Sequence, residues 1–371
     1  MLGHRAQDRR SLTVPPFALW FVGRASPRAP DTSWGVGRPM SPGDHTAARL
    51  RAFHSEAFMS VVALAAAMLL ATTPAVPSAP AADSLIPITI RLQATVGDTP
   101  FSCGKEYPGI GTSGATITAS DFRFYVHNVR LVTARGDTVR AAMAPRSPWQ
   151  DREIALLDFE NGTATCANGT PETNPQITVL APAGEYQGVA FTVGVPFARN
   201  HSDMATQGPP LSLSRLFWSW NAGYKFLRVD MRATRPDSAA TAWVIHLGST
   251  GCTGAAGAKA PTSCSHGNRP EIALSGFNPA RDVIVADLAA LLSRSDVRRN
   301  QPQTAMGCMA APNDADCGGL FASLNLPHPN ATGADTPKFF RVVRGTATGA
   351  ANSAGSGPNG TVNGIVNGGT R

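Results

Sequence analysis

Several motifs that would place this sequence in a catalytic or zinc-binding class are missing. It has no Cys-x-x-Cys spacing, which argues against a cysteine-rich zinc site, and no His-Glu-x-x-His, which argues against a zinc hydrolase. No nucleophilic side chain occurs in a recognisable motif with a general base, and no pair of acidic residues occurs in a recognisable catalytic motif. Charged residues make up only 15% of the chain. These absences favour a binding protein over an enzyme.

The N-terminal region carries the signals of an export leader. An uncharged apolar run at residues 61–71 is far shorter than the roughly 20 residues that a helix needs to cross a bilayer. Small residues up to Ala81 follow it, as is typical of a signal-peptide core and its cleavage site. A membrane anchor is the alternative, and initiation at Met40 would place two arginines ahead of the apolar run. We therefore predict that residues 1–81 are an N-terminal extension and signal peptide, and that the mature protein is periplasmic or secreted.

Removal of the leader also changes the charge balance. Residues 1–81 hold 8 Arg against 4 Asp and Glu, so the formal net charge of +7 falls by 4 to +3. A charge this small makes no case for nucleic acid as a partner.

All 6 cysteines lie in the mature part of the chain. An even number in an exported chain indicates disulfides rather than thiolate ligands. Two pairs are close in sequence, Cys252 with Cys264 and Cys308 with Cys317, and they would leave Cys103 with Cys166. The spacing alone leaves other pairings open.

Apolar residues that alternate with polar ones predict strands along most of the mature part. The pattern occurs at residues 88–96, 189–197 and 227–231. In the strand predicted at residues 121–131, Phe122, Phe124 and Val126 share one face, and the residues expected on the other are Tyr125, His127, Val129 and Leu131.

One helix is predicted at residues 288–292, where Asp287 is the expected N-cap. The expected fold is therefore mainly β, a single antiparallel β-sandwich or barrel-like domain with long disulfide-stapled loops and one short helix. It spans residues 82–343. A tail rich in Gly, Asn and Ser follows at residues 344–371, and it is predicted to be disordered.

Three of the few histidines in the mature part are candidate metal ligands. His127 and His246 lie on predicted strands with apolar residues on both faces, and His201 follows the strand predicted at residues 189–197. Each one alone would be an ordinary core or loop residue. Together they could converge in a sandwich or barrel, and imidazole suits both copper and zinc.

An aromatic cluster at residues 217–226 is the second unusual feature. If this segment is extended, Trp218 and Trp220 lie on one face. Core packing is the ordinary explanation of such a cluster. Two close tryptophans beside a metal would also suit redox chemistry.

Six segments carry a resemblance to a known family, and they follow one another in the family's order over roughly residues 85–343. They are Phe122–Leu131, Leu157–Glu160, Gly194–His201, Phe217–Phe226, His246–Cys252 and Gly307–Cys317. In these segments the chain resembles the MbnP family, also described as metallo-mystery-pair four-Cys proteins. The copper-binding MopE and CorA proteins of methane oxidisers are related to it.

The resemblance implies an exported protein with a copper site built from histidines. It also implies a tryptophan that is oxidised to kynurenine and helps to bind the metal. The implied partner is a MauG-like di-haem enzyme of the cytochrome c peroxidase family, which performs that oxidation. His127 and His201 match the family's histidine positions best, and His246 is a third candidate.

The sequence departs from its relatives at one position. In MopE and CorA the oxidised tryptophan precedes a copper histidine by two residues, and here that position is Tyr125. The oxidised residue is then Trp218, Trp220 or Trp243, or copper binds without the modification. Tyr125 would line the site as a hydrogen-bond partner.

These observations predict an exported copper-binding protein of copper homeostasis that is not an enzyme. The alternative is a β-sandwich recognition module without metal, in which the histidines are core residues.

Overall fold

The computed structural model describes residues 84–219, 222–236, 238–254, 260–331 and 338–345. This part of the chain is mainly β, as predicted. One sheet has the order β18-β17-β1-β8-β6, with β2 beside β1. Its strands are β1 (Leu85–Val96), β2 (Thr99–Pro100), β6 (Ala142–Met143), β8 (Gln176–Pro182), β17 (Val283–Asp287) and β18 (Phe340–Val343).

The second sheet is built around the long strand β4, in the order β13-β12-β4-β9-β16 with three more strands beside β4. Its strands are β3 (Glu106–Ile110), β4 (Ala115–Thr133), β5 (Thr138–Arg140), β7 (Ile154–Asp158), β9 (Tyr186–Val193), β12 (Leu227–Arg235), β13 (Ser238–Leu247) and β16 (Glu271–Ser275). Two hairpins stand apart from both sheets, and they are made of β10 (Phe217–Ser219) with β11 (Gly223–Tyr224) and β14 (Thr250–Thr253) with β15 (Ser263–His266).

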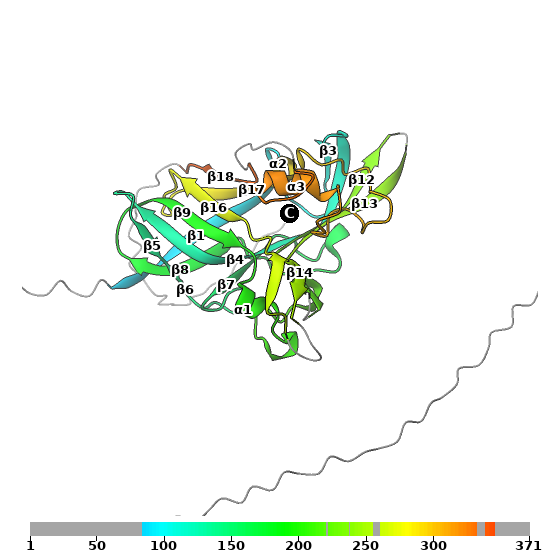
Figure 1. The fold of residues 1–371 in the computed structure, drawn as a ribbon. Coiled ribbons are helices and arrows are strands. Elements are labelled where there is room, and N and C mark those ends of the chain that lie inside the picture. Colours follow the sequence, from blue (N-terminus) through cyan, green and yellow to red (C-terminus); the bar gives the residue numbers. More distant parts are fainter. Residues whose placement is uncertain (1–83, 220–221, 237, 255–259, 332–337, 346–371) are drawn as a thin grey trace, which may run out of the picture. The chain divides into compact units, whose positions relative to one another are not determined.

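The two sheets form the layers of a sandwich (Figure 1) because both contribute side chains to one large core. Ile90 and Leu92 of β1 are buried there, as their alternation with polar residues predicts. Phe122 and Phe124 of β4 enter the same core from the second sheet. The predicted sandwich class is confirmed, although β1 pairs with β17 in parallel.

A smaller core covers the opposite face of β4. It combines Tyr125 with Ile154 and Leu156 of β7, and with Leu216 and Phe226 from the segment between β9 and β12. This segment contains α1 (Phe197–Asn200) and two 3-10 helices, Met204–Thr206 and Ser214–Leu216; a third lies at Ala164–Cys166. The segment that holds His201 and Trp218 is thereby packed against the outer face of the second sheet.

One expectation about β4 is wrong. Val129 and Leu131 lie in the large core with Phe122, whereas they were expected on the face of Tyr125. Asn128 adopts a positive φ of 53°, and the pairing with β9 shifts register between His127 and Arg130. Such a β-bulge adds one residue to the strand and exchanges the two faces beyond it.

The helix prediction is confirmed at one place and incomplete at others. α2 spans Leu288–Leu292, and the carboxylate of Asp287 accepts hydrogen bonds from the backbone N–H groups of Ala289 and Ala290. The expectation of a single short helix is wrong, because α1 and α3 (Cys317–Ser323) are also present. α3 was missed because the glycine pair after Cys317 lowers helix propensity, while packing against α2 supplies the stability.

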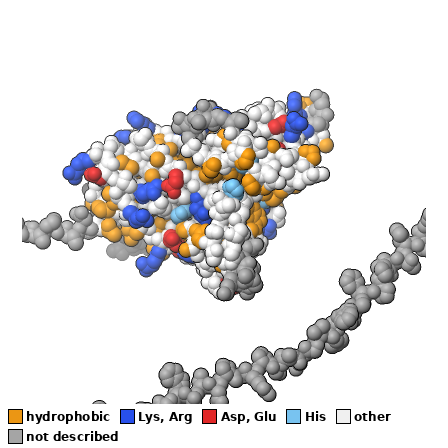
Figure 2. All heavy atoms as spheres, viewed as in Figure 1, with side chains coloured by type: hydrophobic (Ala, Val, Ile, Leu, Met, Phe, Trp, Pro, Cys, Tyr) orange, Lys and Arg blue, Asp and Glu red, His pale blue; other side chains and the backbone are white. Residues whose placement is uncertain are grey.

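Three disulfides join Cys103 to Cys166, Cys252 to Cys264 and Cys308 to Cys317, so the pairing suggested by sequence proximity is present. Lys and Arg side chains are interspersed with acidic ones on the face shown in Figure 2. No helix in the described ranges has the length and apolarity to cross a membrane. The predicted leader (1–81) and nearly all of the predicted tail (344–371) lie outside the described residues, so those boundaries stay predictions.

Candidate metal centre

His246 is held on β13 by a carboxylate from the neighbouring strand. Its Nε2 lies 2.6 Å from Oδ1 of Asp230 on β12. A carboxylate only accepts, so Nε2 carries the proton and Nδ1 has the lone pair in the neutral ring. Nδ1 is buried and has no hydrogen-bond partner among the described residues. Metal-ligating histidines usually have one ring nitrogen on a carboxylate or carbonyl oxygen and the other free for the metal, so this arrangement makes His246 a candidate ligand.

Asp230 is itself fixed as a carboxylate. Burial would raise its pKa, but the hydrogen bond with His246 and the contacts with Arg228 outweigh burial and hold the pKa well below its usual range. Asp230 is therefore ionised at any physiological pH, and it keeps the imidazole of His246 in one tautomer.

His127 has a similarly defined tautomer. Its Nδ1 lies 2.9 Å from the carbonyl oxygen of Gly194, which can only accept, so Nδ1 donates and Nε2 has the lone pair. Burial lowers the pKa of His127, against the opposite effect of the hydrogen bond to Gly194. The ring is therefore neutral near pH 7, which is the form that coordinates metals.

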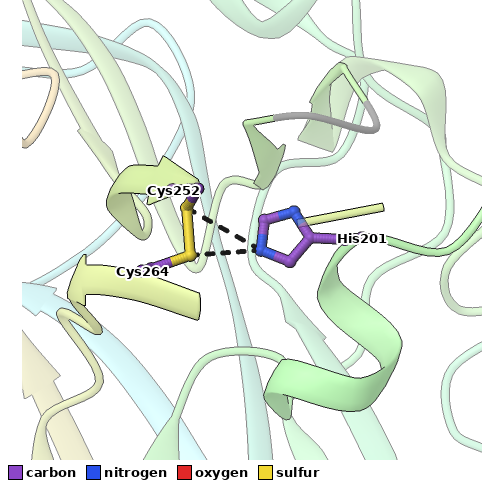
Figure 3. Close-up of side chains that lie close together, drawn as sticks. All are labelled: His201, Cys252 and Cys264. Atoms are coloured by element: carbon purple, nitrogen blue, oxygen red, sulfur yellow. Dashed lines mark hydrogen bonds between the residues drawn. A yellow bond between two sulfur atoms is a disulfide. The ribbon is translucent and has the colours of Figure 1, made fainter. Parts of the chain in front are cut away.

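His201 follows α1 and is 5% exposed. Its Nε2 lies 3.0 Å from Nδ2 of Asn200. The same nitrogen lies 3.3 Å from the sulfur of Cys264 and 3.8 Å from that of Cys252 (Figure 3). The amide of Asn200 is oriented by the backbone N–H of Tyr224, which donates to its Oδ1. Nδ2 of Asn200 therefore donates to Nε2 of His201.

Among the described residues, one group of three potential ligand atoms from His, Cys, Asp or Glu side chains lies within 4.8 Å of one another. It consists of His201, Cys252 and Cys264. Because the two sulfurs form a disulfide, they are not thiolates, and the imidazole is the conventional ligand in this state.

The structure does not bring the three predicted histidines to one point. His246 on β13 lies opposite Arg228 on β12, and Arg228 lies opposite Arg123 on β4. His127 is four residues further along β4 than Arg123, so it lies on the same face of the sheet as His246 but two strands and four residues away. Strand geometry puts their Cα atoms roughly 16 Å apart. No set of three or more ligand atoms within 4.8 Å in the described residues contains two of the three predicted histidines, so each is a separate candidate ligand.

Of the predicted tryptophans, Trp218 lies beside the candidate ligands. Its ring centroid is 6.4 Å from that of His246. It also lines a pocket of about 350 Å³ with Cys252 and Met309. Trp243 is fully buried in the large core, and Trp220 lies outside the described residues.

Tyr125 is fully buried in the smaller core. Its hydroxyl donates to the carbonyl oxygen of Pro210 at 3.1 Å, and its ring meets that of Tyr224 edge-on. In this structure its hydrogen bond therefore serves the packing of the segment that carries His201, and a direct role at a metal stays a prediction.

Comparison with known proteins identifies the family. The MbnP family model matches residues 86–310, which is more than half of the chain.

The chain belongs to the MbnP family. Among solved structures, MbnP from Methylosinus trichosporium is similar with a TM-score of 0.59 and 26% sequence identity, over 70% of this chain and 99% of that one. No curated protein matches significantly. The resemblance to the MbnP family seen in the sequence is thus confirmed, and the match contains His127, His201, His246 and Trp218.

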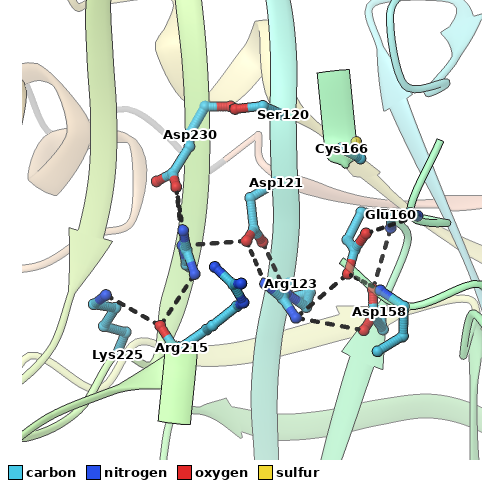
Figure 4. A network of polar contacts seen from close by, with 12 residues as sticks. Ser120, Asp121, Arg123, Asp158, Glu160, Cys166, Arg215, Lys225 and Asp230 are labelled. Atoms are coloured by element: carbon cyan, nitrogen blue, oxygen red, sulfur yellow. Dashed lines mark hydrogen bonds and ion pairs between the residues drawn. The ribbon is translucent and has the colours of Figure 1, made fainter. Parts of the chain in front are cut away.

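A network of ion pairs in this MbnP-family protein links β4 to Asp230 on β12 (Figure 4), the carboxylate that contacts His246. Arg123 of β4, 2% exposed, pairs with Asp121 through Nε at 2.9 Å and with Glu160 through Nη1 at 3.4 Å. Arg228 then joins Asp121, at 3.2 Å, to Asp230. The carboxylate that orients His246 is therefore anchored to the centre of β4.

Sequence reasoning missed Asp230 and Met309. The alternation of Arg228 and Asp230 with apolar residues indicated a polar face on that strand. It did not show that this face meets His246, because cross-strand register is not written in local sequence. No local sequence pattern marks Met309 as a site residue. It lies at the pocket because the preceding residue, Cys308, forms a β-bridge with Ile245.

One carboxyl of the network holds a proton near neutral pH. Burial raises the pKa of Asp158 to about 8, although Arg123 lowers it. The neighbouring Glu160 has more donors, since its two oxygens accept the backbone N–H groups of Gly162 and Thr170. The proton therefore resides on Asp158.

The raised pKa of Asp158 predicts a pH-dependent stability. The unfolded carboxyl titrates near pH 4, so between about pH 4 and pH 8 the folded state binds the extra proton, and stability is lost as the pH rises through 8. Asp158→Asn imitates the protonated form. From pH 5 to pH 9, the wild type should lose at least about 1 kcal/mol more of its free energy of unfolding than the variant does. Urea titrations of both proteins at the two pH values measure this difference. Parallel pH profiles would contradict the assignment.

Proposed function

We propose that this chain is an exported copper-binding protein of copper homeostasis. The observation that carries the proposal is His246, whose Nε2 is held by Asp230 while its buried Nδ1 has no partner among the described residues. Imidazole nitrogen is a preferred ligand of copper, and the Irving–Williams order favours copper over other divalent ions at such a site. Membership of the MbnP family supports a metal-related role.

The residues around His246 suit a soft, redox-active ion. Met309 and Trp218 line one pocket, and the Trp218 ring lies beside His246. A thioether suits Cu(I), and imidazole suits both oxidation states. Bound copper would supply a centre that cycles between Cu(I) and Cu(II). His127 remains a candidate ligand through Nε2, and at His201 a metal on Nε2 would replace the hydrogen bond from Asn200.

We also propose that a MauG-like di-haem partner oxidises a tryptophan of this chain to kynurenine, which would add an amine and a carbonyl to the metal site. Trp218 is favoured because it is partly exposed at the pocket, whereas Trp243 is enclosed in the core. Trp220, which lies outside the described residues, stays a candidate.

Export to the periplasm or beyond is supported by the cysteines. All six are paired, and disulfides persist in oxidising compartments. The second candidate function is a recognition module without metal. The hydrogen bond of His246 with Asp230 favours it, because that contact would also orient a structural histidine.

Copper analysis of the purified protein distinguishes the two functions. Wild-type protein exposed to copper and then desalted should retain it, and His246→Ala should lose most of it because the proposed ligand is gone. His328→Ala is the matched control: this histidine contacts Phe321 and the carbonyl oxygen of Ala311 and does not line the pocket of Trp218, so its loss should leave copper content unchanged.

Both the unmodified protein and protein treated with the di-haem partner are needed for this assay, with peptide mass spectrometry to report any kynurenine. Circular dichroism checks that each variant is folded. Absence of copper from both forms of the wild type would refute the copper proposal and leave the recognition module.

A further inference from the structure

The Cys252–Cys264 disulfide differs from the other two in its exposure and in its neighbour. Both of its cysteines are partly exposed, whereas Cys308 and Cys317 are fully buried and Cys103 pairs with the fully buried Cys166. It joins opposite residues of the β14–β15 hairpin, outside both sheets of the sandwich. A thiolate reductant can therefore reach this bond without opening the large core.

The imidazole of His201 faces this disulfide (Figure 3). Its Nε2 lies 3.3 Å from the sulfur of Cys264 and 3.8 Å from that of Cys252. In a tetrahedral site with metal–sulfur bonds of about 2.3 Å and metal–nitrogen bonds of about 2.0 Å, such ligand atoms are about 3.6 Å apart. The nitrogen already stands at this spacing from both sulfurs, so only the sulfurs have to separate.

We infer that reduction of the Cys252–Cys264 disulfide converts this group into a site for one thiophilic d10 ion, Zn(II) or Cu(I), with His201 as the third ligand. The site goes beyond the proposed copper function, because its sulfur ligands exist only in the reduced protein. Cys252 also lines the pocket shared with Trp218 and Met309, which leaves an open side for the ion to enter.

The redox step balances with a dithiol as the reductant. One thiolate of the dithiol attacks a sulfur of the disulfide and forms a mixed disulfide, and its second thiolate displaces the protein sulfur. The dithiol is oxidised to its cyclic disulfide by two electrons, and Cys252 and Cys264 are released as thiols. Metal binding then displaces one proton from each thiol, and the hydrogen bond from Asn200 to His201 is exchanged for the metal–nitrogen bond.

Partial reduction tests the first part of the inference. The full chain is treated with limited dithiothreitol, alkylated, and analysed by peptide mass spectrometry. Alkylation is expected at Cys252 and Cys264 before any other cysteine, with the near-ultraviolet circular dichroism of the core retained. Earlier labelling of any other cysteine, including the partly exposed Cys103, would overturn it.

Cobalt(II) titration of the desalted, oxygen-free protein tests the metal site. The reduced protein should bind one equivalent of Co(II), with sulfur-to-cobalt charge-transfer bands and the visible bands of tetrahedral coordination. Zn(II) or Cu(I) should bleach these bands. The oxidised protein and Cys252→Ser/Cys264→Ser should not show them.

His201→Ala should weaken Co(II) binding at least about tenfold, since even a residue that only orients a ligand contributes that much. His328→Ala, the matched control, should leave binding unchanged. Reduced wild-type protein without thiolate bands, or bands of equal strength in His201→Ala, would overturn the site. His246→Ala should retain the bands, so failure of the proposed copper function is distinguishable from failure of this site.

Discussion

Arg123→Met is expected to lower the free energy of unfolding by about 3 to 5 kcal/mol, the range found when one partner of a buried ion pair is removed. Arg123 is 2% exposed, and its guanidinium pairs with Asp121 and Glu160 and lies beside Asp158, whose carboxyl is protonated near neutral pH. Methionine fills much of the space of the arginine stem but leaves these carboxyl groups buried without their cation. The loss therefore measures uncompensated charge more than lost packing.

Arg130→Met provides the control on the same strand. Arg130 pairs with Glu271 at 2.8 Å, but their side chains are 28% and 59% exposed. Water screens such a pair, and its removal should cost no more than about 1 kcal/mol. Urea or guanidinium unfolding, monitored by tryptophan fluorescence, gives both values. Equal losses in the two variants would show that the network around Arg123 does not contribute as a buried unit.

Local patterns in the sequence predicted the parts of the fold that depend on neighbours along the chain. The alternation in residues 88–96 gives β1, and Asp287 caps α2, because period-two burial and N-capping are local effects. The family resemblance was also accessible, since it rests on short ordered segments. The β-bulge at Asn128 was not accessible. Asparagine tolerates a positive φ, yet the pairing of β4 with β9 decides whether it is used.

The candidate site was predictable in its residues more than in its geometry. His246 and Trp218 were identified, and the structure places them side by side. The convergence of His127 with His246 was only an expectation, and their separation on the sheet follows from the register of β4, β12 and β13. The contact of His201 with the Cys252–Cys264 disulfide joins residues far apart in sequence, which no local pattern reports.

Gly307→Ala is expected to lower the free energy of unfolding by about 3 to 5 kcal/mol, because an added Cβ meets two costs at once. Gly307 has a φ of +64°, in the left-handed region that disfavours side chains. Its Cβ would also lie 2.3 Å from the carbonyl oxygen and 2.5 Å from the nitrogen of Val244. Backbone atoms of β13 cannot rotate away as a side chain can.

Gly97→Ala separates the two costs. Gly97 has nearly the same φ, +63°, but an added Cβ there would meet nothing within 4 Å, so this variant should lose only about 1 to 2 kcal/mol for the backbone conformation. The additional loss of unfolding free energy in Gly307→Ala then measures the cost of displacing residues 307–309 from β13. Equal losses in urea unfolding would contradict the close approach.

The same variant tests how the fold builds the candidate site. Cys308 donates its backbone N–H to Val244 and accepts that of His246, both at 2.9 Å, so Gly307 lets this segment pair beside His246. Displacement of the segment would move Met309 out of the pocket that it shares with Trp218. Gly307→Ala should therefore change tryptophan fluorescence in the folded state and reduce copper retention, whereas Gly97→Ala should alter neither. A folded Gly307→Ala protein with wild-type fluorescence and copper content would show that Met309 and this segment do not shape the metal site.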